Sequence, residues 1–469
     1  MTTGESSEKG QVLVLIVLSM VVLFGFAALA IDGGMVFSDR RHAQNASDAS
    51  SLAGGSAAAL DLENDHVTYG TWNCNSSNVH DAMEDAVDAA IDRAGDNDFT
   101  IDGDADDHDG NVDDHHGAIT ACGVEDRGPW TEKYIDVTTE ISTTTPTTFA
   151  HFVYSGKLKS RVKAVTRIRP RAALGFGNSI VGLNDQGCDG NQNGVIFDGN
   201  IDVLVKGGGI FSNGCLKGSG NTLNVDVVGG DITYIEELVT QHTNTFDPTP
   251  QSGDGLGLPD FAMAFPVPDC SLVDDFSHPS TEYRNNAGGP DADPEFIPDG
   301  NYSEIKMNGA VELEGGGLYC MYGDFDAGNN NLTIKPTHRG GKIYHGVTIY
   351  LVSGSFVTDG NADNVNLSAP PDDPDPDPAI PGMLIYLAQG NTGLVKLRGN
   401  SDSVFVGTIY APNGTIDVAC TSDMPAGEFA EYNTQLVANN VKIGGNAYVN
   451  VNFDEDTSYL MPTNLELHR

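Results

Sequence analysis

The most distinct feature of the hydrophobic pattern is an apolar run close to the N-terminus. It extends from Val12 to Ile31, contains no charged residue, and has Ser19 as its one polar side chain. Because an α-helix rises about 1.5 Å per residue, a helix over this run would be about 30 Å long, which matches the hydrocarbon core of a bilayer. The pattern predicts a membrane-spanning helix within residues 11–60, preceded by a short cytoplasmic tail at residues 1–10.

Three fates of this helix are compatible with the sequence. The first is a retained single-pass anchor, which the length of the run favours because the apolar part of a secretory signal usually covers about 7–15 residues. The second is a cleaved signal, since Lys9 precedes the run and Ala28-Leu29-Ala30 has the form of a cleavage site. The third is removal of a pilin-type leader after Gly10, although type IV pilins usually carry Glu where this chain has Leu15.

Residues 61–172 have the pattern of a small, pilin-like α+β domain. Apolar side chains recur at helical spacing from Val79 to Ala94 and predict an amphipathic helix. Alternating patterns at residues 134–141 and 162–168 predict two strands. A helix with strands packed on it is an α+β arrangement, and we place the end of this domain near Pro170.

The remaining residues, 173–469, are rich in Gly and Asn and predict an all-β body. A Gly-Asn pair precedes an alternating stretch at Gly199, Gly220, Gly328, Gly360, Gly399 and Gly445. Glycine supplies the positive φ of a tight corner, asparagine tolerates it, and the residues that follow alternate between the two faces of a strand. Repeated corners with short strands favour a parallel β-helix, and an antiparallel β-sandwich with Gly-Asn hairpins is the alternative.

Charge narrows the range of partners. The chain has 66 acidic and 24 basic residues, which gives a formal net charge of -42. Binding to nucleic acid requires clustered Lys and Arg that neutralise phosphates, so we expect no nucleic-acid partner. Such acidity is compatible with an extracytoplasmic body.

One acidic stretch suggests a cofactor. Within residues 95–117, which we expect to form a loop, Asp102, Asp104, Asp106 and Asp113 occupy the first, third, fifth and twelfth positions of an EF-hand-like calcium loop. The sixth position, where the sharp turn needs Gly, is Asp107. Calcium is therefore the one cofactor that the sequence suggests, and a solvated acidic loop is the alternative.

Seven cysteines are spread along the chain without any C-x-x-C spacing. This distribution disfavours a zinc site and thioredoxin-type chemistry, and in an exported protein disulfides are the default. Sequence order suggests three pairs and leaves Cys420 over; the pairs are Cys74–Cys122, Cys188–Cys215 and Cys270–Cys320.

An ordered series of short motifs follows the apolar run. It reads Asp32-Gly33-Gly34, then Arg40-Arg41, then Gln44-Asn45-Ala46-Ser47-Asp48-Ala49, then Leu52-Ala53-Gly54. In order and spacing, the series resembles the N-terminal signature of the TadG-like proteins of Tad/Flp pilus assembly. Pro146-Thr147-Thr148-Phe149, between the two predicted strands, and the Gly/Asn-rich strands of residues 173–469 are also similar to regions of such proteins.

The helix beyond the membrane carries small side chains along one face. Ala43, Ala46, Ala49 and Ala53 recur at steps of three and four residues. A face of small residues lets another helix approach closely, so we expect it to contact pilus components. The alternative is an alanine-rich helix with high intrinsic propensity and no partner.

The resemblance implies a membrane-anchored, cell-surface structural protein of a Tad/Flp-type pilus or secretion system, either an assembly factor or a minor pilin-like subunit. We expect one membrane crossing at Val12–Ile31, a cytoplasmic N-terminus, an extracytoplasmic body in a bacterium, contacts with Tad-system proteins through the N-terminal helix, and self-association. A secreted or surface adhesin is the alternative. We expect no enzyme, since HExxH, GxSxG and P-loop motifs are absent and a β-helical polysaccharide-acting enzyme would need more basic side chains.

Overall fold

The computed structural model describes residues 11–104, 117–128, 130–149, 158–188, 194–241, 243–253, 266–276, 282–284, 294–359, 365–399, 403–420, 430–445 and 448–468. The chain forms two compact units. The first, which we call the N-terminal unit, contains Met1–Glu125, Glu132–Arg171 and Thr463–Arg469. The second, which we call the body, contains Asp126–Thr131 and Ala172–Pro462.

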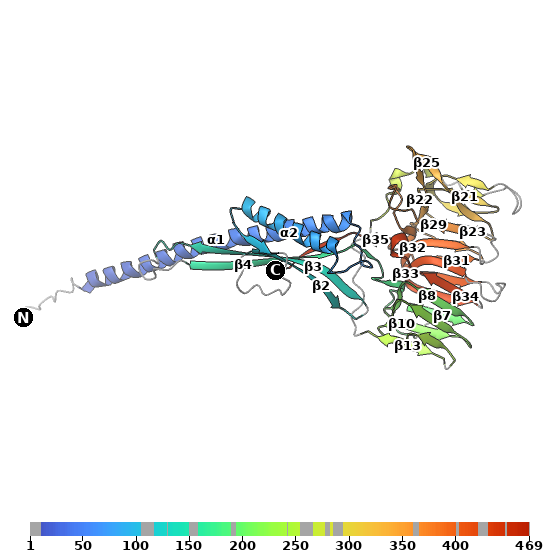
Figure 1. Cartoon of the computed structure of the whole chain (residues 1–469), viewed down its shortest axis with the longest axis horizontal. Coiled ribbons are helices and arrows are strands. Elements are labelled where there is room, and N and C mark those ends of the chain that lie inside the picture. Colours follow the sequence, from blue (N-terminus) through green and yellow to red (C-terminus); the bar gives the residue numbers. More distant parts are fainter. Residues whose placement is uncertain are drawn as a thin grey trace, which may run out of the picture. The chain divides into compact units, whose positions relative to one another are not determined.

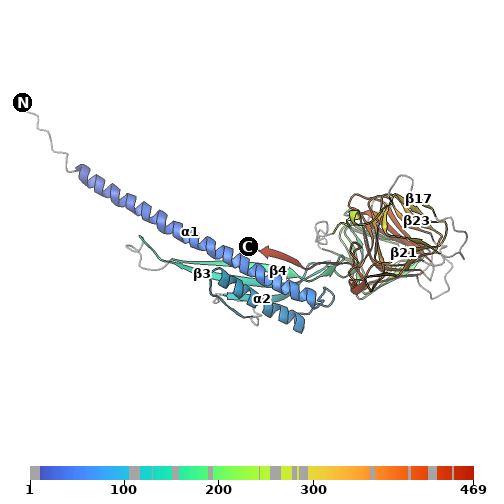
Figure 2. The ribbon, with the colours of Figure 1, turned by 90° about the horizontal axis from the view of Figure 1, so that it is seen from above.

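The N-terminal unit combines two helices with a sheet. The helices are α1 (Gln11–Asn64) and α2 (Ser77–Asp96). In the described residues the sheet has the strand order β1 (Asp102–Asp104), β2 (Gly117–Asp126), β3 (Thr131–Thr145), β4 (Leu158–Arg169) and β36 (Asn464–His468). Figure 2 shows α1 and α2 alongside β3 and β4. The predicted helix and both predicted strands are therefore present, with longer bounds than the sequence suggested.

Local chemistry explains where α2 begins and which face it buries. The side chain of Ser76 accepts a hydrogen bond from the backbone N–H of Val79 and so caps the first turn. The residues that repeat every three or four positions are buried; they are Val79, Ala82, Met83, Ala86, Val87, Ala90 and Ala94. This apolar face packs against α1 and the sheet to form the core of the N-terminal unit.

The last strand of the chain completes this sheet. β36 pairs antiparallel with β4, so that Leu465 lies opposite Ile168. From the sequence we assigned residues 173–469 to the body. This prediction was wrong for Thr463–Arg469, which belong to the N-terminal unit. The start of the body, at Ala172, lies next to the boundary expected from Pro170.

A buried ion-pair network joins β3, β4 and β36. The carboxylate of Glu132, which is 2% exposed, accepts hydrogen bonds from Arg167 at 3.3 Å and Arg169 at 2.7 Å. Arg167 also makes a two-pronged contact with Asp136 at 2.8 and 2.9 Å, and this contact is the largest cause of its raised pKa. Arg169 reaches Glu466 on β36 at 3.0 Å. The network therefore ties the C-terminal strand to the middle of the sheet.

Nearly all the regular structure of the body is short strands that pair in parallel. The strands before the middle of the unit are β5 (Ala172–Ala173), β6 (Asn178–Gly182), β7 (Gly194–Gly199), β8 (Asp202–Lys206), β9 (Gly209–Ser212), β10 (Cys215–Ser219), β11 (Asn224–Val228), β12 (Ile232–Tyr234), β13 (Glu237–Thr240), β14 (Thr245–Asp247) and β15 (Gln251–Ser252). Each of β6 to β12 pairs with the strand three places further along the chain. Such pairing produces three ladders that run side by side.

The second half of the body continues the same ladders. Its strands are β16 (Asp275–Phe276), β17 (Glu282–Arg284), β18 (Glu295–Ile297), β19 (Gly300–Tyr302), β20 (Glu304–Lys306), β21 (Val311–Glu314), β22 (Gly317–Met321), β23 (Phe325–Gly328), β24 (Leu332–Lys335), β27 (Val347–Leu351), β28 (Phe356–Thr358), β29 (Asn366–Ser368), β30 (Met383–Leu387), β31 (Leu394–Gly399), β32 (Val404–Cys420), β33 (Ala430–Gly445) and β34 (Tyr448–Asn452). The body also contains a hairpin of β25 (Thr337–Arg339) with β26 (Lys342–Tyr344), the strand β35 (Leu460–Met461), and short 3-10 helices at Cys270–Leu272 and Glu455–Thr457. β35 pairs with β5.

The ladders begin and end in the middle of the body. The first strands, β6, β7 and β8, pair with the last ones, β33 and β34. Figure 1 shows the resulting order from β13 through β7, β33 and β32 to β22. Every pairing resolved in the 24-stranded sheet of the described residues is parallel, so the antiparallel sandwich that we kept as the alternative does not describe it.

Similar sequence motifs stack in register within the ladders. Tyr350 lies opposite Tyr386, and Tyr386 lies opposite Tyr410, with ring centroids 5.1 and 5.5 Å apart. Gly346 and Gly382, which precede the first two of these strands, have φ of 74° and 70°. A Cβ at either position would lie 2.2–2.4 Å from backbone atoms of a neighbouring segment, so only glycine fits.

The disulfides link distant parts of each unit. The described residues contain Cys74–Cys122 in the N-terminal unit and Cys188–Cys215 and Cys270–Cys320 in the body. These are the three pairs that sequence order suggested. Loops of this length restrict the unfolded chain and are typically worth about 2–4 kcal/mol each.

We expect Glu132→Ala to destabilise the N-terminal unit by about 3 kcal/mol, because it leaves two partly buried guanidinium groups without their shared carboxylate. Chemical unfolding of the purified full-length chain in detergent, followed by circular dichroism, measures the loss. Glu466→Ala is the matched control, since Glu466 is 52% exposed and its pair should be worth less than about 1 kcal/mol. Equal, small effects of the two variants would contradict a buried network that supports the sheet.

Candidate functional site

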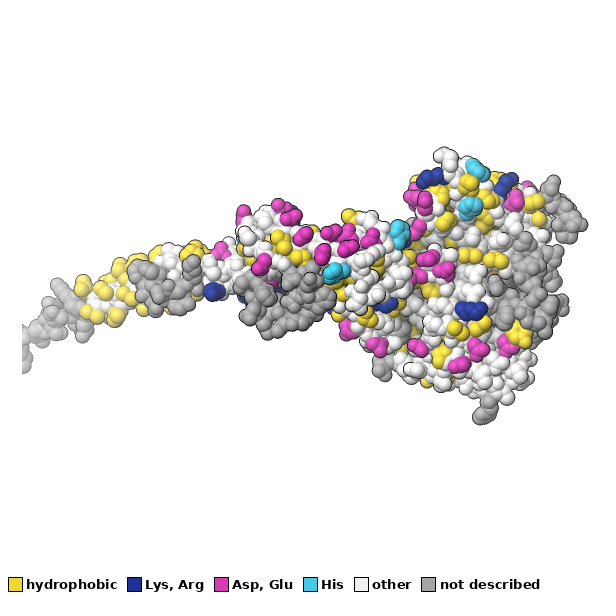
Figure 3. Space-filling view, viewed as in Figure 1, with side chains coloured by type: hydrophobic (Ala, Val, Ile, Leu, Met, Phe, Trp, Pro, Cys, Tyr) yellow, Lys and Arg dark blue, Asp and Glu magenta, His cyan; other side chains and the backbone are white. Residues whose placement is uncertain are grey.

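The N-terminal half of α1 exposes its apolar side chains on all sides. Between Val12 and Ile31 they are strongly exposed, with Leu23 at 67% and Phe24 at 71%. Figure 3 shows these hydrophobic atoms along the described start of the helix. Within the described residues, α1 is the one helix that is long and apolar enough to cross a membrane. Exposed apolar surface of this extent requires a non-aqueous environment or a partner that covers it.

The C-terminal half of α1 is instead a core element of the N-terminal unit. Ala43 and Ala46 are each 1% exposed and lie in the core formed with α2 and the sheet. Gly54 is equally constrained, because a Cβ there would lie 2.5 Å from the carbonyl oxygen of Ala86 and 2.9 Å from Val137. The prediction that the Ala43–Ala53 face contacts other proteins was therefore wrong for Ala43 and Ala46, whose side chains are covered by the chain itself.

Polar groups of α1 also bond to the sheet. The hydroxyl of Ser47 donates to the carbonyl of Thr139 at 2.7 Å, and Thr166 donates to Ser51 at 3.1 Å. Because these side chains are small, the helix approaches the strands closely enough for direct contact. The small residues of α1 therefore allow the helix to pack against the sheet of its own unit. Periodicity alone could not distinguish this packing from packing against another protein.

The two halves of α1 meet at Asp32, directly after the apolar run. Its side chain is 3% exposed. Its carboxylate accepts hydrogen bonds from the backbone N–H of Thr148 at 2.9 Å and of Phe149 at 3.1 Å. Both residues follow the end of β3, and in the described residues no neighbouring strand accepts hydrogen bonds from their backbone N–H groups. The Asp32 carboxylate satisfies these two donors instead. We call this contact the Asp32 clamp.

A second contact supports the clamp two turns further along the helix. The hydroxyl of Thr145, the last residue of β3, donates to the carboxylate of Asp39 at 2.5 Å. Asp32 and Asp39 are seven positions apart and therefore lie on the same face of α1. Together they hold the end of β3 against the helix at the point where the apolar run stops.

Sequence reasoning named both partners of the clamp but not their contact. Asp32 belongs to the Asp32-Gly33-Gly34 motif and Thr148 and Phe149 to the Pro146–Phe149 motif, which are 116 positions apart. A carboxylate directly after a long apolar run needs hydrogen-bond donors if it is removed from water. The position of Asp32 in the sequence was therefore the one signal that it would have partners. Which donors supply them depends on strand pairing that a local pattern does not contain.

The proposed calcium ligands do not form a described site. Asp102 and Asp104 lie in β1, which pairs parallel with β2, so part of the expected loop is a strand. Asp106 and Asp113 lie outside the described residues. Among the residues that the structure describes, no group of three or more His, Cys, Asp or Glu side chains could hold a metal ion. Calcium binding therefore stays a prediction of the sequence.

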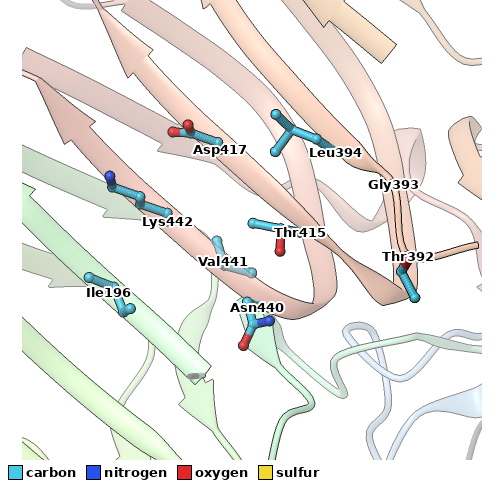
Figure 4. A pocket seen from close by; sticks show the side chains of 9 residues that line it. All are labelled: Ile196, Thr392, Gly393, Leu394, Thr415, Asp417, Asn440, Val441 and Lys442. Carbon is cyan, nitrogen blue, oxygen red and sulfur yellow. The ribbon is translucent and has the colours of Figure 1, made fainter. Parts of the chain in front are cut away.

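The body has a hollow of about 320 Å³ on one of its ladders. Figure 4 shows that its lining comes from β31, β32, β33 and β7, which lie side by side. Several of its polar groups already have partners. Asp417 is paired with Arg398 at 3.0 Å, and Lys442 with Asp198 at 3.6 Å. Asn440 accepts from Asn184 at 2.9 Å and from the N–H of Gly194 at 3.0 Å. These contacts stabilise neighbouring strands.

A cluster of charged and phenolic groups lies elsewhere in the body. Arg339 contacts Glu314 at 2.6 Å and Asp299 at 3.8 Å. Burial raises the pKa of Asp299, the nearby Glu314 raises it further, and Arg339 opposes both. Burial also raises the pKa of Tyr319, whose hydroxyl donates to the carbonyl of Ile297 at 2.8 Å. The two carboxyl groups share one guanidinium, an arrangement that holds strands together.

Comparisons with known proteins identify one segment. Residues 10–59 match the family described as "Putative Flp pilus-assembly TadE/G-like". The match covers the apolar run, the Asp32 motif and most of the packed half of α1, and it confirms the resemblance of the N-terminal motifs. The resemblance proposed for Pro146–Phe149 and for residues 173–469 lies outside the match and stays a prediction. Comparison with curated proteins and with solved structures gives no match to the chain.

The raised pKa of Asp299 predicts a pH effect on the body. Between the ordinary pKa of an aspartate and the raised value, the unfolded chain loses a proton that the folded chain keeps, so rising pH lowers stability. Asp299→Asn removes this loss. We therefore expect the free energy of unfolding of the variant, relative to that of the wild type, to increase as pH rises from about 3.5 to 7. Unfolding curves at both pH values measure the gain. Asp226→Asn, on the exposed face of β11, is the control; an equal gain for both variants contradicts the prediction.

Proposed function

We propose, from the TadE/G-like segment at residues 10–59, that this chain is a membrane-anchored structural protein of a Tad/Flp-type pilus or secretion system. The observation that carries the proposal is the double nature of α1, which is an exposed apolar span over one half and a core helix over the other. A folded unit that is built on the continuation of a membrane helix is held at a fixed distance from the bilayer. The role is an assembly factor or a minor pilin-like subunit.

In this proposal the chain crosses the membrane once, with the N-terminus inside and the folded units outside. Three disulfides in the described residues support an oxidising compartment for both units. Arg40 and Arg41 follow the apolar run, and by charge alone they would favour the opposite orientation. Long soluble domains translocate largely regardless of such charges, so the disulfides support the outward orientation of the folded units.

We further propose that the body is a parallel β-helix that is displayed as a stiff surface. Three parallel ladders and in-register stacks such as Tyr350, Tyr386 and Tyr410 support this architecture. In a solenoid, each turn is buttressed by its neighbours, so the stack resists bending. A mechanical role needs no catalytic group, and we assign none.

Adhesion by the body is the second candidate. The hollow between β31 and β7 supports it, because hydroxyl, amide, carboxylate and ammonium groups lie beside the apolar side chains of Leu394 and Ile196. Such a lining would suit a polar ligand. It would be tested by binding of the full chain to a glycan array, with Thr415→Leu as the variant that should lower any signal.

The N-terminus and the fractionation of the native protein separate the remaining alternatives. We expect an intact N-terminus in the membrane fraction, with release by detergent but not by high salt or alkali. A chain that begins at Gln11 in sheared filaments would instead identify a processed, pilin-like subunit. A soluble chain that begins near Ile31 would contradict membrane anchoring, because the span would then have been removed as a signal.

A further inference from the structure

We propose that the described segment after β3, Pro146–Phe149, which the Asp32 clamp holds against α1, is part of a bilayer-docking surface. In this arrangement Phe149 contacts lipid within the headgroup layer, and the exposed basic groups of Arg40, Arg41 and Lys159 contact lipid phosphates. The proposal rests on the anchoring of α1 in a membrane proposed above. The occupant of the surface is the same bilayer that α1 crosses.

The clamp fixes the height of Thr148 and Phe149 relative to the apolar run. Asp32 directly follows Ile31, the last residue of the apolar run, and its carboxylate lies 2.9 and 3.1 Å from the backbone nitrogens of Thr148 and Phe149. The polar layers of a bilayer add about 5–8 Å on each side of the hydrocarbon core. A backbone segment in contact with the first residue beyond the span therefore lies inside that layer.

The side chains at this height are apolar and exposed. Phe149 is 43% exposed, and Phe37 on the adjacent part of α1 is 68% exposed. Phe37 lies about 9 Å along the helix from Ile31, close to the outer edge of the headgroup layer. Aromatic side chains in this layer remove apolar area from water, which gives these exposed rings a physical reason.

The charge at this end is the opposite of the charge of the chain. Against a net charge of -42, α1 has the exposed residues Arg40 and Arg41 one turn beyond Phe37. Their Cα atoms lie about 14 Å along the helix from Ile31, outside the layer, so it is their long side chains that would reach lipid phosphates. On β4, Lys159 lies opposite Thr144, next to the residue that bonds Asp39, and its side chain is exposed. Arg161 on the same strand is paired with Glu140. Guanidinium and ammonium groups are the natural partners of lipid phosphates.

Continuity with the span favours a bilayer over a protein partner. The surface begins directly after the last residue of the apolar run. If α1 crosses a bilayer, the lipid headgroups are next to this surface, whereas a protein partner would have to enter the headgroup layer to reach it. The exposed basic residues and the exposed rings lie at the same end of the N-terminal unit, and together they match both parts of a lipid interface. A neighbouring copy or another protein is distinguished from lipid by the experiment.

The experiment measures the depth of a probe at position 149 in the full-length chain. Cys420 is the cysteine left over by the three disulfides, so Cys420→Ser gives a background for single labelling. In that background, Phe149→Cys is labelled with the fluorophore NBD, and the chain is reconstituted in vesicles of phosphatidylcholine and phosphatidylglycerol. Nitroxide groups on the lipid acyl chains quench a fluorophore that lies in the bilayer.

Val124→Cys in the same background is the matched control. Val124 is an apolar strand residue with 59% exposure. Its neighbour Gly123 lies against the ring of Tyr134, because a Cβ added to Gly123 would be 2.3 Å from that ring. Val124 therefore lies near the end of β3 that is opposite to Thr145. Tyr134 and Thr145 are eleven positions apart along β3, which corresponds to about 35 Å.

We expect several-fold stronger lipid quenching at position 149 than at position 124. Asp32→Ala should reduce the quenching at position 149 while the chain still floats with the vesicles, because the clamp and not the span is lost. Replacing Arg40, Arg41 and Lys159 together by Gln should reduce it in vesicles with phosphatidylglycerol more than in phosphatidylcholine alone.

Three results would overturn the proposal. If the chain floats with vesicles and position 149 is quenched no more than position 124, anchoring stands and docking is wrong. If the probe emission shifts to the blue without lipid quenching, a protein covers the surface and not lipid. If the chain does not float with vesicles, membrane anchoring itself is wrong, and the docking proposal fails with it.

Discussion

The structure depends on one helix having two environments. Over its first half, α1 exposes apolar side chains in every direction, and over its second half one face of it is buried against α2 and the sheet. At the change between them, every polar group must be satisfied, because an unpaired donor or carboxylate at the edge of a bilayer costs several kcal/mol. Asp32 meets this requirement by accepting from two backbone N–H groups at the end of β3. The clamp therefore couples the position of the sheet to the end of the exposed apolar run of α1.

Close packing extends this coupling through the N-terminal unit. Gly54 and the buried alanines allow α1 to touch α2 and β3 directly, and hydroxyl groups such as that of Ser47 bond to the strands. The sheet is then closed by β36, the last strand of the chain, which the Glu132 network ties to β4. Since β6 to β8 pair with β33 and β34, the body starts and ends at neighbouring strands. The body is thus an insertion between β4 and β36, and the sheet of the N-terminal unit gains β36 only after the body has been made.

Local patterns predicted the elements, and non-local pairing determined what they do. The span at Val12–Ile31, the helix near Val79–Ala94 and the strands that became β3 and β4 follow from periodicity, because burial of one face repeats at a fixed interval. Order along the chain was enough for the three disulfides. Three features depend on contacts between residues more than 100 positions apart, which periodicity does not record. They are the pairing of Thr463–Arg469, the start of the ladders in the middle of the body and the partners of Asp32. The face at Ala43 and Ala46 was misassigned for the same reason, since a small-residue stripe has one appearance whether it packs on a partner or on its own sheet.

Hydrogen exchange of the Thr148 and Phe149 amides, in the full chain reconstituted in a bilayer, tests the clamp most directly. The account predicts that both amides exchange slowly in the wild type, although they lie beyond the end of β3, and that Asp32→Ala makes them exchange as fast as an open loop. Fast exchange of both amides in the wild type would contradict the claim that the Asp32 carboxylate holds the segment after β3 against α1.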